Sequence, residues 1–248
     1  MIIDSFDQSE PIVKPKHFYG EQQHRVDKCL ILLSSEIFKY LQENYALTEA
    51  GLIGGSSYSV PVYTFEHKGE KIGVLLTPMG SVLSANNIIE SSYILGASKY
   101  VMFGSCGSLD DNLTKGKFVI PFEAYRDEGV SYHYMKPSDF VEIKNHEKVE
   151  KIFKQLSIPY VKGKTWTTDA PYMETVNLVK KRKEEGCIVV EMELAACQAV
   201  ANYYHFELYA FLQPGDVLIP HNYDKSLLHD ANHDLVKLDI GLKIIEEI

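Results

Sequence analysis

The sequence predicts an α/β domain built around a mostly parallel or mixed sheet. Short apolar runs that suit buried strands alternate along the chain with segments whose apolar residues recur at helical spacing. With 248 residues, the chain is long enough to bury a large core, and no internal repeat or linker interrupts it. We therefore expect one domain over residues 1–248, with an irregular polar arm at 1–27 that carries Pro11 and Pro15.

Strands are expected where short apolar or alternating runs end at turn-forming residues. These runs are Cys29–Leu33, Val60–Glu66, Lys71–Thr77, Lys99–Phe103, Phe118–Tyr125, Ile188–Val190 and Leu208–Leu212. A turn signal, Lys68-Gly69-Glu70, separates the second run from the third. The third run ends at the breaker Pro78-Met79-Gly80.

Helices are expected where apolar residues recur every three or four positions. Ser34 and Ser35 offer an N-cap to a helix whose apolar stripe contains Ile37, Phe38 and Leu41. The other helical segments are marked by Val82, Ile88, Ile89 and Leu95; by Val149, Ile152, Phe153 and Leu156; by Leu194, Cys197, Val200, Ala201 and Tyr204; and by the stretch Leu235–Ile245.

Composition excludes several classes of function. The formal net charge of −9 and the absence of a basic run argue against nucleic-acid binding. The four cysteines lack CxxC spacing, which predicts buried free thiols in a reducing compartment and no metal site. No apolar run has the length of a membrane span, and the N-terminus is acidic where a signal peptide is basic. We expect a cytoplasmic protein without a membrane partner.

Small, polar or ionisable residues follow four of the predicted strands. They form the segments Gly104-Ser105-Cys106-Gly107, Arg126-Asp127-Glu128-Gly129, Glu191-Met192-Glu193 and Pro214-Gly215-Asp216. Each segment by itself is explained by a plain turn or by exposed carboxylates at the start of a helix. Together they indicate a ligand site, because ligands of such sheets bind beyond the carboxyl ends of the strands. The first segment is expected to be a loop whose backbone N–H groups approach an anion or a base.

These residues together resemble the nucleoside phosphorylase family. The motifs that carry the resemblance are Gly104–Leu109, Val190–Glu193 and Gly215-Asp216-Val217, and the runs Arg126–Tyr134 and Trp166–Tyr172 are similar to its uridine-phosphorylase-like branch. The resemblance is strong from about Gly96 to Leu218 and weak before Gly80. It implies a three-layer α/β/α fold whose central sheet is mixed and partly barrel-like, and cleavage of a nucleoside to a free base and ribose 1-phosphate.

The resemblance assigns residues to the ribose site and to the role of general acid. Glu193 matches the carboxylate that accepts hydrogen bonds from the ribose 2′- and 3′-hydroxyls, a geometry that suits two oxygens in one plane. Met192 matches the residue packed under the sugar. Asp216 matches the general acid that protonates a purine leaving group, a role that needs a raised pKa. An acid at position 216 therefore favours a purine over a pyrimidine.

The resemblance also assigns a base pocket, whose residues are Cys106, Gly107, Tyr172 and Glu191; Glu191 is in addition expected to support its own loop. Pro171 replaces the first of the family's two aromatic residues, so base stacking rests on Tyr172 or Trp166, or is weaker than in the family. His17 matches an N-terminal histidine that reaches the ribose of a neighbouring subunit, which implies a homo-oligomer, from dimer to hexamer, with shared sites. The alternative for His17 is a surface histidine on a mobile arm.

The largest departure from the family concerns phosphate. The first loop reads Leu33–Phe38, with Glu36 poorly placed for an anion, and Met102 stands where the family has an arginine. Of the usual phosphate contacts, Ser105 and the backbone at Gly80 remain. A dianion without charged partners is costly to bury.

Three alternatives stay open for the missing arginines. Phosphate binds through lysines or Arg126, or water replaces phosphate and the enzyme is a hydrolase, or the chain binds nucleosides without catalysis. Arg126 is most simply a buried partner of Asp127 or Glu128. Retention of Glu193 and Asp216 argues against loss of catalysis, and the resemblance favours the phosphorylase, with phosphate as co-substrate and no other cofactor.

Overall fold

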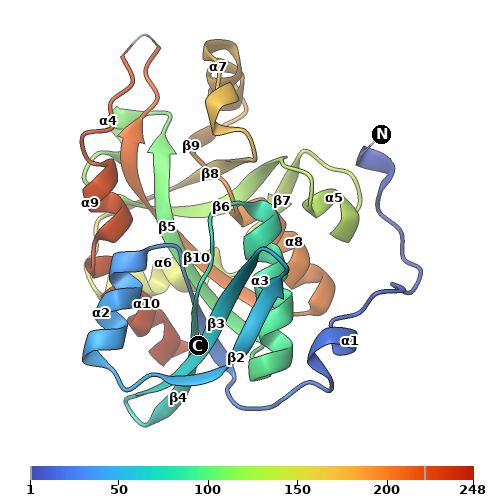
Figure 1. Cartoon of the computed structure of the whole chain (residues 1–248). Coiled ribbons are helices and arrows are strands. Elements are labelled where there is room, and N and C mark those ends of the chain that lie inside the picture. The colour runs from blue at the N-terminus through green and yellow to red at the C-terminus, as the bar shows by residue number, and fades with distance from the viewer. Residues whose placement is uncertain (1, 221) are drawn as a thin grey trace.

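Ten strands in one sheet form the centre of the molecule (Figure 1). The computed structural model describes residues 2–220 and 222–248, so Met1 of the predicted arm lies outside the described residues. The strands are β1 (Lys28–Leu32), β2 (Thr48–Gly55), β3 (Tyr58–His67), β4 (Glu70–Leu76), β5 (Lys99–Ser108), β6 (Phe118–Asp127), β7 (Phe140–Glu142), β8 (Tyr160–Thr168), β9 (Cys187–Glu191) and β10 (Glu207–Val217).

Helices cover both faces of this sheet. They are α1 (Lys16–Tyr19), α2 (Ser35–Asn44), α3 (Ser81–Leu95), α4 (Asp111–Thr114), α5 (Ser131–Tyr134), α6 (His146–Gln155), α7 (Val176–Glu184), α8 (Leu194–Tyr204), α9 (Leu228–His233) and α10 (Val236–Glu247), with short 3-10 turns η1 (Ile2–Asp4) and η2 (Pro171–Met173). None of the helices in the described part of the chain is long and apolar enough to cross a membrane.

Half of the sheet closes on itself. The strand order β10-β6-β8-β9-β5 returns to its start because β5 also pairs with β10, and this closure makes a five-stranded barrel. From β5 the order β1-β4-β3-β2 continues as an open wing. Parallel pairs such as β1–β5 and β6–β8 occur beside antiparallel pairs such as β5–β9 and β3–β4. The expectation of a mixed, partly barrel-like sheet is confirmed.

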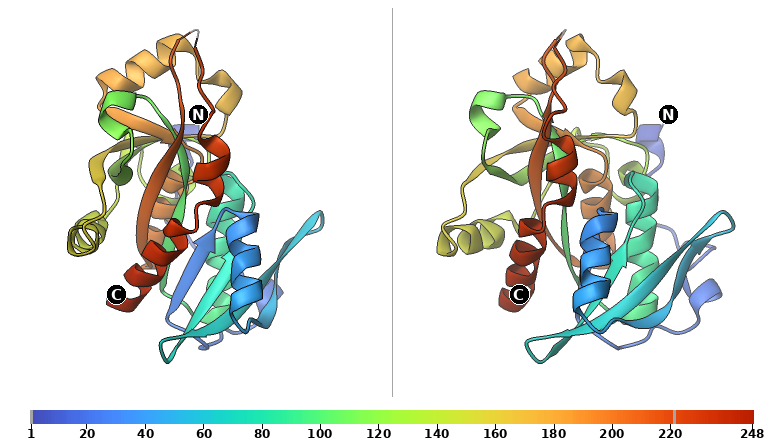
Figure 2. Two further views of the ribbon diagram at one scale, coloured as in Figure 1. Left: turned by 90° about the vertical axis from the view of Figure 1, so that its left-hand side faces the viewer. Right: turned by 60° about the vertical axis from the view of Figure 1, so that its left-hand side comes forward.

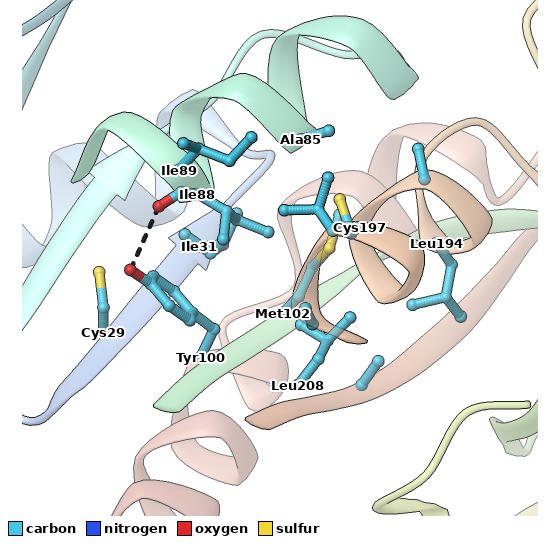
Figure 3. Close-up of a cluster of buried hydrophobic side chains, with 14 of the residues drawn as sticks. Cys29, Ile31, Ala85, Ile88, Ile89, Tyr100, Met102, Leu194, Cys197 and Leu208 are labelled. Atoms are coloured by element: carbon cyan, nitrogen blue, oxygen red, sulfur yellow. Dashed lines mark hydrogen bonds between the residues drawn. The ribbon is translucent and has the colours of Figure 1, made fainter. Parts of the chain in front are cut away.

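The three layers follow from the alternation of side chains along the buried strands. In β5, Tyr100 and Met102 belong to the core under α3 and α8, whereas Val101 and Phe103 belong to the core under α2, α6 and α10. Figure 3 shows the first of these cores, in which the Tyr100 hydroxyl donates a hydrogen bond to the carbonyl of Ile88. Because both faces are buried, these strands are continuous apolar runs in the sequence.

Several elements differ from the expectations. Strand β8 was not expected because Lys162 and Lys164 make it polar; their ammonium groups pair with Glu150 and Glu123 at 2.9 and 2.8 Å. Strands β2 and β7 and helices α7 and α9 were also not expected. The arm at 1–27 is not wholly irregular, since it contains η1 and α1. The two views of Figure 2 show α7 beside the loop that follows β10, at the end of the barrel opposite the C-terminus.

Candidate active site

A cavity of about 870 Å³ lies where β5, β9 and β10 approach the starts of α2 and α7 and the α9–α10 segment. Most of the site residues expected from the sequence line it: Ser105, Cys106, Gly107, Tyr172, Glu191, Met192, Glu193 and Asp216. Gly80 and His17 are not in the lining. The fold therefore brings residues from β5, η2, β10 and the segment at the end of β9 to a single chamber.

The segment Gly104–Gly107 is not a loop, and that expectation is wrong. It continues β5 and pairs in parallel with β10, with Gly107 opposite Asp216 and a bulge between Pro214 and Asp216. Its backbone N–H groups therefore take part in the sheet ladder. What this segment still offers to an anion is the Ser105 side chain. A Cβ atom at Gly107 would lie 2.5 Å from the Leu218 side chain and 3.4 Å from Oδ1 of Asp216, so glycine allows β5 to approach this carboxyl.

Glu191 is the buried support of the segment that follows β9. Its Oε2 accepts hydrogen bonds from the backbone N–H groups of Glu193 and Leu194, at 2.8 and 2.7 Å, and so caps α8. Its Oε1 accepts hydrogen bonds from the hydroxyls of Thr165 and Thr167 on β8. Burial raises the pKa of Glu191, and these four donors oppose that rise because they favour the ionised carboxylate.

Glu193 is held from both sides by backbone donors. Gly80 N–H donates to Oε1 at 2.7 Å and Met192 N–H donates to Oε2 at 3.2 Å. The Ser81 hydroxyl donates to the Met192 carbonyl at 2.7 Å, which ties the start of α3 to this loop. Burial, followed by the charge of Glu191, raises the pKa of Glu193 to about 8. The Gly80 N–H, expected at phosphate, thus positions a carboxylate in this structure.

Asp216 lies at another part of the cavity beside two groups that the sequence did not suggest. The Tyr223 hydroxyl donates to Oδ2 of Asp216 at 2.8 Å. Burial raises the pKa of Asp216, against the effect of this hydrogen bond. Burial, with the negative charge of Asp216, also raises the pKa of Glu174 to about 7. Two carboxyls with raised pKa values therefore face one cavity, an arrangement suited to proton donation.

The two candidates for base stacking are separated by burial. Trp166 is only 1% exposed, packs in the core and donates from Nε1 to Oδ2 of Asp127 at 2.9 Å, so it does not reach the cavity. Tyr172 is 100% exposed in η2 and lines the cavity. Of the pair, Tyr172 remains as the aromatic ring available to a base.

Replacement of Tyr172 by alanine is expected to raise KM for a nucleoside at least about fivefold, since stacking of a base on an aromatic ring is worth roughly 1–3 kcal/mol. The melting temperature should not change, because the side chain makes no buried contact. Steady-state kinetics and thermal unfolding measure the two effects. Tyr172→Phe, which keeps the ring, is the control; an unchanged KM in the alanine variant would remove Tyr172 from the base site.

None of the three arginines lines the cavity. Arg126 is buried, but the expected pairing with Asp127 or Glu128 is wrong: its guanidinium donates to Oγ of Ser131, to Oγ of Ser138 and to backbone carbonyls of the 136–138 turn. Asp127 instead lies 3.8 Å from Arg182, which pairs with Glu185 at 2.6 Å. Met102, at the position of a family arginine, is part of the core.

The basic side chains of the cavity come from the C-terminal part of the chain. Lys237 and His233 line it, together with Asn232, Ser34 and Ser105. Nδ1 of His233 lies 2.8 Å from the Ser34 hydroxyl, and the Ser105 hydroxyl donates to Oδ1 of Asn232. Glu36 is exposed and outside the lining, with its carboxylate 3.9 Å from Nε2 of His233.

Sequence patterns missed Lys237, His233, Glu174 and Tyr223. One signal was present for Lys237: it is a lysine inside an apolar helical stretch, where a buried charge needs a reason. His17 is exposed on α1 and accepts a hydrogen bond from Lys14 N–H within its own turn. Its expected role in a neighbouring subunit's site stays a prediction.

The fold and the cavity agree with comparisons to known proteins. A family model described as the phosphorylase superfamily matches residues 29–225. The chain belongs to the phosphorylase superfamily. The predicted resemblance is thereby confirmed at the level of the family. A Streptococcus pneumoniae purine nucleoside phosphorylase of the DeoD type is 22% identical to it over 236 residues, covering 92% of this chain and 98% of the relative.

The solved structures of similar fold include proteins named as a hydrolase and as a nucleosidase. The Helicobacter pylori futalosine hydrolase mutant superposes on this superfamily member with a TM-score of 0.71 at 14% identity, over 90% of this chain and 100% of that one. The AMP nucleosidase of Bacteroides thetaiotaomicron gives a TM-score of 0.66 at 16% identity, over 90% and 88%. At such identities the likeness shows the shared fold, and the chemistry depends on the residues that line the cavity.

Proposed function

We propose that this protein cleaves the N-glycosidic bond of a nucleoside and transfers the ribosyl group to phosphate, releasing a free base and ribose 1-phosphate. The observation that carries the proposal is the presence in one cavity of a doubly anchored carboxyl, Glu193, and an acid of raised pKa, Asp216. The first suits a ribose diol and the second suits a leaving base.

Glu193 holds the ribose in this proposal. In its ionised form the Glu193 carboxylate has about four acceptor sites, and the N–H groups of Gly80 and Met192 occupy one on each oxygen. One site on each oxygen is left for the 2′- and 3′-hydroxyls. Met192 supplies the apolar floor below the sugar. The sugar is thus placed with C1′ facing the nucleophile, and the transition state at C1′ has oxocarbenium character.

Asp216 completes the reaction at the base. As the bond between C1′ and the base nitrogen breaks, its electron pair moves into the base, and Asp216 donates a proton to a ring nitrogen. A phosphate oxygen attacks C1′ from the opposite face. Asp216, which is a carboxylate after donating its proton, then recovers a proton from solvent. The raised pKa keeps a larger share of Asp216 protonated before the reaction.

Hydrolysis on the same scaffold is the second candidate, with water in place of phosphate. The observation that favours it is the composition of the cavity: Glu174, Glu191, Glu193 and Asp216 line it, and no arginine does. Several carboxylates in a partly buried chamber disfavour a dianion. A site that binds nucleosides without catalysis is disfavoured by the two carboxyls placed for chemistry.

Release of free base from inosine, adenosine and uridine, measured with and without phosphate, tests the proposed function. The purine nucleosides are expected to be cleaved when phosphate is present, with ribose 1-phosphate formed in equal amount. Equal cleavage without phosphate, yielding free ribose, would replace phosphorolysis by hydrolysis. Binding of a nucleoside without release of base under either condition would overturn both.

A further inference from the structure

We propose that Lys237, His233 and Ser34 form an oxyanion subsite of the cavity, which takes a phosphate group in place of the absent arginines. The inference rests on the proposed function for the adjoining ribose and base positions. The phosphate group has two possible sources with the same chemistry: inorganic phosphate as acceptor, or the phosphate ester of a nucleotide substrate.

Lys237 is the buried cation of this subsite. Its side chain is 1% exposed and lines the cavity, and its ammonium donates to the backbone carbonyls of Ala231 and Asn232. An ammonium has three donors, so one remains for a ligand. Within the described residues, no carboxylate lies within 4.0 Å of Nζ. A buried charge without a counter-ion is costly, and an oxyanion in the cavity would supply the counter-ion.

The carboxylate that acts on Lys237 is engaged elsewhere, whereas the exposed Glu36 carboxylate lies 3.9 Å from Nε2 of His233. Asp234, whose charge acts on Lys237, accepts hydrogen bonds from Gln213 Nε2 at 2.8 Å and from Val236 N–H at 3.0 Å. Burial nevertheless lowers the pKa of Lys237 to about 8, which means that the local carboxylates compensate its charge incompletely. The missing compensation matches what a bound phosphate group provides.

Ser34 and His233 extend the subsite toward α2. Ser34 is the N-cap of this ten-residue helix, and its hydroxyl oxygen accepts a hydrogen bond from Ile37 N–H at 3.2 Å. The same oxygen lies 2.8 Å from Nδ1 of His233. The first N–H groups of α2, at Ser35 and Glu36, have no partner within the helix and carry its positive dipole end. Donors from α2 and α9 therefore adjoin the buried cation.

Ser105 connects the oxyanion subsite to the reaction centre. Its hydroxyl donates to Oδ1 of Asn232, whose backbone carbonyl accepts from Lys237 at 3.3 Å. Ser105 precedes Cys106 and Gly107 on β5, beside the segment that carries Asp216. A phosphate group bound at Lys237 and His233 thus lies in the chamber that holds Glu193. There it is either the acceptor of the ribosyl group or the phosphate ester of a bound nucleotide.

Calorimetric titration of the whole protein with inorganic phosphate, with adenosine and with AMP tests the subsite. Lys237→Met removes the charge and keeps an unbranched side chain that is one atom shorter. We expect it to weaken binding of the phosphate-bearing ligand at least about tenfold, which corresponds to about 1.4 kcal/mol. Adenosine binding should change less than about twofold, because the ribose and base contacts remain. Lys151→Met, at an exposed position on α6, is the matched control.

The outcomes separate the subsite from the proposed function. Loss of binding with inorganic phosphate supports an acceptor site, and loss with AMP alone supports a nucleotide phosphate. Phosphate-dependent cleavage with unchanged phosphate affinity in Lys237→Met would keep phosphorolysis and overturn the subsite. Phosphate-independent cleavage with Lys237-dependent AMP binding would keep the subsite and overturn phosphorolysis. If Lys237→Met fails to fold, His233→Gln, with a side chain 23% exposed, has to weaken the same ligand, and an unchanged affinity overturns the proposal.

Discussion

Replacement of Glu193 by alanine is expected to lower kcat/KM for nucleoside cleavage by about 10²- to 10⁴-fold. The variant loses two hydrogen bonds from ribose hydroxyls to a carboxylate, and such bonds are worth roughly 1.5–3 kcal/mol each. It also leaves the N–H groups of Gly80 and Met192 without their acceptor. Initial rates of base release, measured at saturating and at low nucleoside, give the loss in kcat and in kcat/KM.

Glu193→Gln is the matched control, because it keeps the shape and one acceptor oxygen. It should retain more activity than the alanine variant, because one oxygen still accepts a hydrogen bond from Gly80 or from ribose. Near-normal turnover in Glu193→Ala would show that the ribose lies elsewhere in the cavity.

The glutamine variant also changes the pH dependence of stability. The pKa of Glu193 rises from 4.5 to about 8 in the folded protein, so folding takes up a proton between these values. The free energy of unfolding of the wild-type protein should therefore fall as pH rises through this window, by at most about 1.4 kcal/mol per pH unit for this group. Urea unfolding of Glu193→Gln should lack this contribution; parallel curves for the two proteins would contradict the buried state of Glu193.

Replacement of Asp216 by asparagine is expected to lower kcat for adenosine or inosine by about 10²- to 10⁴-fold, the usual contribution of a general acid. The loss should be small for 4-nitrophenyl riboside, since 4-nitrophenolate leaves without a proton. Comparison of the two substrates by steady-state kinetics therefore isolates proton donation from binding. An equal loss on both substrates would assign Asp216 a role other than the acid.

Tyr223→Phe gives the control for Asp216. It removes the hydrogen bond that the hydroxyl donates to Oδ2 at 2.8 Å and keeps the carboxyl. That hydrogen bond lowers the pKa of Asp216, so its loss should shift the alkaline limb of the pH–rate profile, where the general acid loses its proton, to higher pH. Turnover itself should persist. A collapse of activity in Tyr223→Phe would mean that the tyrosine takes part in the chemistry directly.

Buried strands and the helices that cover them were predictable where burial acts on both faces of a strand, whereas the partly barrel-like sheet was expected only from the family resemblance. Runs such as Cys29–Leu33 and Leu208–Leu212 are apolar at every position because each face meets a different core. The polar strand β8 was not predictable in this way. Its lysines become acceptable only when Glu123 and Glu150 approach from other elements, which no local pattern records.

The candidate site shows the same difference between local sequence patterns and contacts made across the chain. By itself, the sequence determined the α/β class and the superfamily and indicated Glu193 and Asp216 as candidate site residues, because strand periodicity and compact motifs are local properties. Only the tertiary structure decided that Gly80 meets Glu193, that Ser105 meets Asn232 and that Ser34 meets His233, across 113, 127 and 199 residues of chain. Such contacts depend on how the sheet closes and where α9 and α10 return, so the cationic part of the cavity is a product of folding and not of any motif.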